Sequence, residues 1–385
     1  YTAVRFGNPD IRTADRVRIQ PFPDVSASPG GWHYAPKQGA PYLTQGNNML
    51  TRFENVNWLG KKTGEIYYAK STTDNFNFDL DLAGDPKKYV DAAISNVDYI
   101  GNYVHDQLYN YGFNEAAGNF QRYNPSRQGK EDDPVIALVQ EYAMGDNSAF
   151  KTPPDGENGV LFMGLFGLFS KRDSSFDNTI ILHELAHGLS NRLVGGAHQS
   201  DCLRSQPGRS IGEGISDFYA TWATMKSTDT RLATRNFGEY ADSGPMRKYP
   251  YSTNMKENPL TYKNIVTNTE VHAVGTIWAT MLYEMYWNLV DTMGYALPRQ
   301  DVDLTKGNML ALQLVINSLT TNSCEPDFIE ARNQIIEAEK ETTGGVHECK
   351  IWAAFAKRGL GFAAKLVNDK PVEDYSVPPK CQNAI

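Results

Sequence analysis

The residues best suited to catalysis lie in one short stretch of the 385-residue chain, IILHELAHGL over 180–189. His183 and His187 are four positions apart, so on a helix both imidazoles lie on one face and can reach a single metal ion. Glu184 lies beside that face, where a general base for a metal-activated water must stand. The stretch therefore predicts a catalytic zinc site on a helix.

The same pattern also arises by accident, with a probability of roughly 1% in a chain of this length and composition, and it then lies on a surface helix. Here apolar residues surround the motif, which indicates a buried or half-buried helix. Two histidines and a glutamate are costly to bury without a partner such as a metal ion. We therefore favour the metal site.

A third protein ligand decides the class of zinc site. The pattern HExxHxxGxxH requires glycine and histidine where this chain has Ser190 and Leu193, which excludes a three-histidine site. The downstream carboxylates that can replace the third histidine are Asp201, Glu213 and Asp217. Glu213 and Asp217 share a helix face, so one can bind zinc while the other accepts a hydrogen bond from a ligating imidazole. Without the histidine motif, we would interpret them as a solvated helix face.

The part of the chain before about Ser170 has the pattern of strands and turns. Apolar and polar residues alternate strictly over 76–82, which predicts a strand. The apolar run over 160–169 predicts a buried strand that leads into the zinc helix. One long helix interrupts this part, with Asp85 as its cap and Gly112 at its end.

After Phe176 the apolar spacing is helical, over about 177–193, 210–225, 272–290, 304–319 and 326–341. We therefore expect an α+β protein of two domains. Residues 1–175 form a β-rich N-terminal domain with one long helix, and residues 176–385 form a helical C-terminal domain that carries the zinc site.

Composition and charge exclude several classes of protein. Hydrophobic residues make up 41% and charged residues 21% of the chain, which excludes a disordered protein. The net charge is −8 without a cluster of lysine and arginine, so we expect no nucleic acid and no anionic membrane as partner. The longest apolar run is shorter than the roughly 20 residues that cross a bilayer.

The four cysteines, Cys202, Cys324, Cys349 and Cys381, are even in number and form no CxxC pair. This usage predicts two disulfides and an oxidising compartment, which favours secretion. The pairing stays open, although a bond from Cys324 to Cys349 is disfavoured if each begins a helix and the two helices are antiparallel. The chain begins at Tyr1 without a leader, so we expect any signal and pro-segment to have been removed.

Three segments together resemble the fungalysin family of secreted fungal zinc metallopeptidases, relatives of thermolysin: HELAHGLSNRL over 183–193, GEGISDF over 212–218 and EVHAVGTIW over 270–278. Shorter matches, such as TPPDG over 152–156, extend the likeness to most of the chain. The resemblance implies a thermolysin-like fold with the zinc helix at the cleft between the two domains. It also implies an extracellular, monomeric enzyme made as a zymogen, with its pro-segment as inhibitor and proteins and peptides as substrates.

The resemblance implies a role for each matching residue. His183, His187 and Glu213 match the family's zinc ligands, and Glu184 matches its catalytic glutamate. Asp217 falls where thermolysin-like enzymes keep the carboxylate behind the first histidine.

His272 matches the histidine that steadies the oxyanion of the tetrahedral intermediate. By itself, a histidine at this place would be interpreted as a capping or core residue before a buried helix. Thermolysin has an aspartate five residues before this histidine and a tyrosine nine residues before the glutamate ligand, where this chain has Thr267 and Arg204. The oxyanion must therefore use donors besides His272, and the sequence leaves them open.

Two further residues match substrate-binding positions. Arg247 corresponds to the arginine that holds a substrate carbonyl, or else it is a surface charge. The segment NSAF over 147–150 resembles the edge strand that pairs with the substrate backbone, with Ala149 at its centre. The acidic run over 131–133 lacks the alternating spacing of a dedicated calcium loop, so nothing supports Ca²⁺ as a second cofactor beside the one Zn²⁺.

We therefore expect a zinc-dependent endopeptidase that hydrolyses internal peptide bonds through a zinc-activated water. Two alternatives stay open. An aminopeptidase of the same zinc class would carry a Gly-x-Met-Glu-Asn stretch, which this chain lacks. A non-catalytic, zinc-stabilised binding module would need a fourth protein ligand, and no cysteine or histidine is spaced to supply one.

Overall fold

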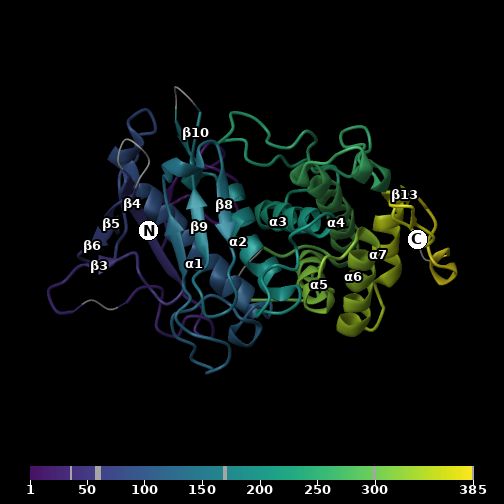
Figure 1. The fold of residues 1–385 in the computed structure, drawn as a ribbon, viewed down its shortest axis with the longest axis horizontal. Coiled ribbons are helices and arrows are strands. Elements are labelled where there is room, and N and C mark those ends of the chain that lie inside the picture. The colour runs from purple at the N-terminus through teal and green to yellow at the C-terminus, as the bar shows by residue number, and fades with distance from the viewer. Residues whose placement is uncertain (35–36, 57–61, 168–170, 298–300, 384–385) are drawn as a thin grey trace. The chain divides into compact units, whose positions relative to one another are not determined.

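The computed structural model describes all residues except 35–36, 57–61, 168–170, 298–300 and 384–385 (Figure 1). It divides into two compact units. The first comprises residues 1–192 together with 238–246, and the second comprises 193–237 together with 247–385.

The first unit contains a mixed five-stranded sheet in the order β5-β4-β7-β9-β8. The strands β4, β7 and β9 are parallel, and antiparallel strands lie at both edges. The edge strand β8 pairs with β9 in a register that sets Ala149 opposite Phe162. The bounds are β4 (Met49–Val56), β5 (Lys62–Tyr67), β7 (Val135–Leu138), β8 (Ser148–Lys151) and β9 (Val160–Met163).

The predicted long helix is confirmed as α1 (Val90–Asn110), which packs against β4. It follows a 3-10 turn over Pro86–Tyr89, where the Asp85 side chain accepts a hydrogen bond from the Lys87 amide. A Cβ atom at Gly101 would lie 2.4 Å from the Met49 side chain, so the helix approaches the sheet closely at this point.

The strand predicted over 76–82 is wrong. Phe76 is buried and its neighbours alternate in exposure, as the pattern indicates. The Phe76 carbonyl accepts a hydrogen bond from the Thr2 amide at 3.0 Å, but residues 76–82, all of them described, belong to no strand. Alternation reports which side chains face a core, whereas a strand also needs a neighbouring chain in register.

The remaining strands of the first unit form short antiparallel pairs. The apolar run over 160–169 forms β9 and then β10, and its last two residues lie outside the described part of the chain. The pairs are β1 (Thr2–Ala3) with β2 (Val17–Arg18), β3 (Tyr42–Leu43) with β6 (Lys70–Ser71), and β10 (Leu165–Phe166) with β11 (Arg172–Asp173).

The second unit is helical (Figure 1). Its central helix, α4, packs against α3, α5 and α7, and α6 packs against α5 and α7. The five helices predicted after residue 176 are confirmed to within three residues at each end. They are α2 (Asn178–Leu193), which belongs to the first unit up to Arg192, and α3 to α6 of the second unit, whereas α7 is not among them. The helices are α3 (Gly208–Thr224), α4 (Val271–Met293), α5 (Gly307–Thr321), α6 (Phe328–Thr343) and α7 (Glu348–Lys357), followed by the hairpin β12 (Lys365–Val367) and β13 (Lys370–Val372).

The expected α+β class and the two disulfides are confirmed. The pairs are Cys202 with Cys324, and Cys349 with Cys381. Both bonds close loops inside the second unit. Within the described residues, no helix has the length and apolar character that crossing a membrane requires.

The largely buried side chain of His33 lies between an exposed carboxylate, Asp74, and a buried one, Asp98, in the first unit. Its Nδ1 lies 3.0 Å from Asp74 Oδ1, and its Nε2 lies 3.2 Å from Asp98 Oδ2. Burial lowers the pKa of the imidazole, but the hydrogen bonds to the two carboxylates outweigh it and raise the pKa to about 9. Because the folded state holds this proton more tightly than the unfolded chain, the protonated imidazole stabilises the fold.

This stabilisation is complete below the unfolded pKa of about 6.5 and is lost as the pH rises through about 9. We expect the free energy of unfolding to fall by up to about 3 kcal/mol across this range, and His33→Gln to remove that part of the dependence. Denaturant unfolding at a series of pH values measures both slopes. Equal slopes in the two proteins would contradict the assignment.

Candidate metal centre

The histidine motif lies on α2 (Asn178–Leu193), and a buried carboxylate fixes the start of this helix. Asp177 accepts hydrogen bonds from the Thr179 hydroxyl at 2.6 Å and the Thr179 amide at 3.2 Å. It also accepts from the backbone amides of Tyr240 and Ala241. Burial raises the pKa of Asp177 to about 6, although the bond from Thr179 opposes this rise. One side chain thus holds both the helix start and the segment 238–246.

Arg192 fixes the other end of α2. Its guanidinium is fully buried and lies 3.1 Å from Asp133 and 3.5 Å from Asp155. It donates to the carbonyl of Gly118 at 2.7 Å and lies over the ring of Phe120. The partners come from distant parts of the sequence, and no spacing in the sequence signals them. The last turn of the helix is therefore tied to three loops of the first unit.

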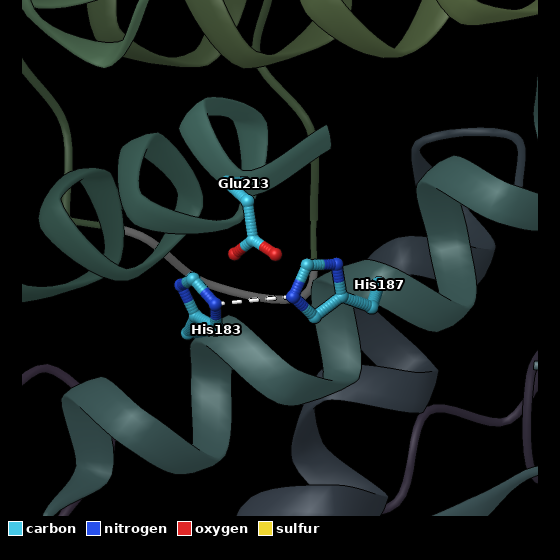
Figure 2. Close-up of side chains that lie close together, drawn as sticks. All are labelled: His183, His187 and Glu213. Carbon is cyan, nitrogen blue, oxygen red and sulfur yellow. Dashed lines mark hydrogen bonds between the residues drawn. The ribbon is translucent and has the colours of Figure 1, made fainter. Parts of the chain in front are cut away.

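Between these two anchors, His183 and His187 direct their imidazoles toward each other. Their Nε2 atoms are 3.1 Å apart (Figure 2). The carbonyl of His187 accepts hydrogen bonds from Asn191 at 2.9 Å and from Thr152 at 3.3 Å, which orients this turn of the helix. His183 is buried and His187 is half-buried.

Glu213 completes the group. Figure 2 shows the Glu213 carboxylate pointing toward the two imidazoles. One ligand atom from each of His183, His187 and Glu213 can be chosen so that all lie within 4.8 Å of one another. Within the described ranges, this is the one cluster of histidine, cysteine or acidic side chains that meets that distance. The acidic run over 131–133 does not belong to such a cluster, and its Asp133 contacts Arg192 instead.

Close packing of α3 on α4 sets the position of Glu213. A Cβ atom on Gly214 would lie 2.5 Å from the carbonyl oxygen of Gly275, and a Cβ on Gly275 would lie 2.7 Å from the Glu213 Cβ. The two backbones therefore meet at the residue that carries the carboxylate. His272, one turn before Gly275, brings its Nε2 to 3.4 Å from Glu213 Oε2.

The three side chains fit a divalent metal ion. Two imidazole nitrogens and one carboxylate are the protein ligands of one common class of catalytic zinc site. The 3.1 Å between the two Nε2 atoms is close to the roughly 3.3 Å that separates two ligands on one tetrahedral zinc ion with bonds near 2.05 Å.

Asp217 and Arg247 form a buried pair one turn beyond Glu213. Arg247 donates to both carboxylate oxygens of Asp217, at 2.7 and 2.9 Å, and the Tyr251 hydroxyl donates to the same carboxylate. Burial lowers the pKa of Arg247, but the charge of Asp217 outweighs it and raises the pKa. The surface-charge interpretation of Arg247 is therefore wrong. The sequence did not indicate Tyr251, because nothing in its spacing links it to Asp217.

The remaining predicted residues lie on the expected elements. Glu184 is on α2 with 7% of its surface exposed. Ala149 is half-buried in β8, the edge strand of the sheet. His272 lies in the first turn of α4, with 43% of its side chain exposed.

The family model for fungalysin metallopeptidase matches residues 1–364. The chain belongs to the fungalysin family. The predicted resemblance is thus confirmed, and membership of a metallopeptidase family implies a bound metal ion.

Curated relatives are similar to this chain over most of its length. It is 42% identical to an extracellular metalloproteinase of Aspergillus flavus (89% of this chain, 55% of the relative) and 41% identical to one of Aspergillus oryzae (94% and 58%). The chain therefore spans little more than half the length of these relatives. Among solved structures, it resembles the precursor of protealysin from Serratia proteamaculans, with 11% identity, a TM-score of 0.48, and coverage of 82% of this chain and 86% of that one.

The packing around Glu213 predicts that alanine is harmful at one of its two neighbouring glycines and tolerated at the other. Gly214→Ala forces a methyl group against the backbone of α4, and we expect it to lower stability by about 1–3 kcal/mol and metal affinity by on the order of tenfold. Gly212→Ala meets only Leu203, at 3.4 Å, and we expect stability to change by less than about 1 kcal/mol. Unfolding curves and competition with a chelator measure the two effects. Equal behaviour of the two variants would refute the packing argument.

Proposed function

We propose that this chain is a secreted zinc endopeptidase that hydrolyses internal peptide bonds of extracellular proteins. The observation that carries the proposal is the convergence of His183, His187 and Glu213, with Glu184 next to the first histidine. Membership of the fungalysin family and the relatives named extracellular metalloproteinases support it.

His183, His187 and Glu213 are the residues that would hold the zinc ion. Zinc bound by three protein ligands keeps a position open, lowers the pKa of water toward neutrality and polarises a carbonyl. Glu184 acts as general base and takes a proton from the attacking water. The same carboxyl then delivers that proton to the departing amine, so Glu184 returns to its original protonation state.

Other side chains bind and orient the substrate in this proposal. The edge strand β8, with Ala149 at its centre, offers unpaired backbone groups to an extended peptide. His272 donates a hydrogen bond to the oxyanion that develops on the attacked carbonyl. Asp217 holds Arg247 through two hydrogen bonds, and the remaining guanidinium N–H groups bind a substrate carbonyl.

Protein and peptide substrates follow from the proposed reaction. Inhibition by a pro-segment, the monomeric state and the lack of nucleic-acid and membrane partners stay predictions.

Two substitutions separate metal binding from proton transfer. We expect Glu184→Gln to keep one zinc ion per chain and to lose at least about 100-fold in kcat, because an amide cannot take the proton. We expect Glu213→Ala to lose zinc and activity together. Metal analysis and cleavage of a peptide substrate give the two readouts.

Asp201→Ala is the control, because this carboxylate is exposed and pairs with Arg204 at the surface. It should change neither zinc content nor cleavage. Full activity of a zinc-free Glu213→Ala protein would end the proposal.

Removal and return of the metal distinguishes a catalytic from a structural ion. We expect a chelator to abolish cleavage while circular dichroism stays unchanged, and added zinc to restore it. The substrate for this test carries a blocked N-terminus, so internal cleavage also excludes an aminopeptidase. Unfolding upon chelation would favour the zinc-stabilised module instead.

A further inference from the structure

The first turn of α4 is capped by a residue that contacts a second group. Glu270 is the N-cap, and its carboxylate accepts hydrogen bonds from the amides of His272 at 3.0 Å and Ala273 at 2.8 Å. The same Oε1 atom lies 2.5 Å from Nδ1 of the His272 ring. One carboxylate therefore binds both the helix start and the imidazole.

The other ring nitrogen of His272 faces Glu213. Nε2 lies 3.4 Å from Glu213 Oε2, so the two carboxylates contact opposite sides of the ring. With 43% of the side chain exposed, packing alone constrains this ring weakly. The contact with Glu270 is therefore a main restraint on which way Nε2 points.

Glutamate is an unusual N-cap, and its length explains how it reaches the His272 ring as well as the helix amides. Serine, threonine, aspartate and asparagine are the preferred N-caps, because their short side chains reach the amides of the first turn. Glutamate is longer, and here its reach extends to an imidazole two residues further along. Thr267 stands where thermolysin has an aspartate, five residues before the histidine. Its hydroxyl donates to the Asn264 carbonyl in its own turn, and not to the His272 ring.

We propose that Glu270 is a positioning residue for His272, a role that rests on the proposed function of His272 as oxyanion donor. Glu270 accepts a hydrogen bond from Nδ1–H and thereby aims Nε2 at the reaction centre. Its hydrogen bonds are with His272 and Ala273, and not with the residues proposed to hold zinc. Loss of Glu270 thus misaligns the hydrogen bond that His272 donates to the oxyanion in the transition state, while metal and substrate binding persist.

Three substitutions separate this role from helix capping. Glu270→Ser keeps a cap but cannot reach the ring, Glu270→Ala removes both contacts, and Glu270→Gln keeps an acceptor within reach of Nδ1. Asp327→Ser is the matched control, because Asp327 caps α6 with the same pair of amide contacts away from His272.

We expect Glu270→Ser and Glu270→Ala to lower kcat by on the order of tenfold with KM within about twofold. Glu270→Gln should recover kcat to within about threefold. Zinc content should be unchanged in all variants, and Asp327→Ser should keep normal kinetics.

A second readout does not depend on activity. In the metal-free protein, we expect the ¹⁵N resonance of His272 Nδ1 to move in Glu270→Ser and Glu270→Ala, and to stay near its original position in Glu270→Gln and Asp327→Ser. This spectrum reports the contact itself.

Loss of kcat in Glu270→Ala but not in Glu270→Ser would overturn the inference, because capping alone would then explain it. An unmoved Nδ1 resonance in Glu270→Ser would overturn it as well. If the unaltered chain cleaves no peptide, the proposed function fails, and the resonance still decides whether Glu270 holds the ring.

Discussion

Two imidazole nitrogens 3.1 Å apart, with a carboxylate close to both, form an arrangement that the rest of the structure must support. Removing such groups from water costs free energy unless a partner compensates them, and a divalent cation compensates all three at once. In the proposed function, this convergence also serves hydrolysis, since the carboxylate of Glu184, the proposed general base, directly follows the first histidine on the same helix.

Residues outside the histidine motif over 183–187 hold this arrangement in place. Asp177 and Arg192 hold the two ends of α2, so the direction of both imidazoles is set by buried polar contacts on each side of them. Gly214 on α3 and Gly275 on α4 lack side chains, which lets the two helices touch at Glu213. The positions of these three side chains thus depend on residues outside their cluster, as is usual for sites whose geometry must be precise.

Local patterns in the sequence predicted the α+β class and every described α-helix except α7, and the resemblance predicted the family. The family model confirms the resemblance, and the functional roles of the individual residues stay predictions. The strand over 76–82 failed because alternation does not report a pairing partner. The contacts of Arg247 with Asp217 and of Arg192 with Asp133 could not be foreseen, since they join residues 30 and 59 positions apart without any periodic signal.

Anomalous diffraction at the zinc absorption edge, from crystals of the zinc-loaded chain, tests the central claim most directly. The account predicts one strong peak per molecule, within about 2.0–2.2 Å of one nitrogen each from His183 and His187 and of a Glu213 oxygen, with no fourth protein ligand. A peak bound by other residues, or one closed by a fourth protein side chain, would contradict it.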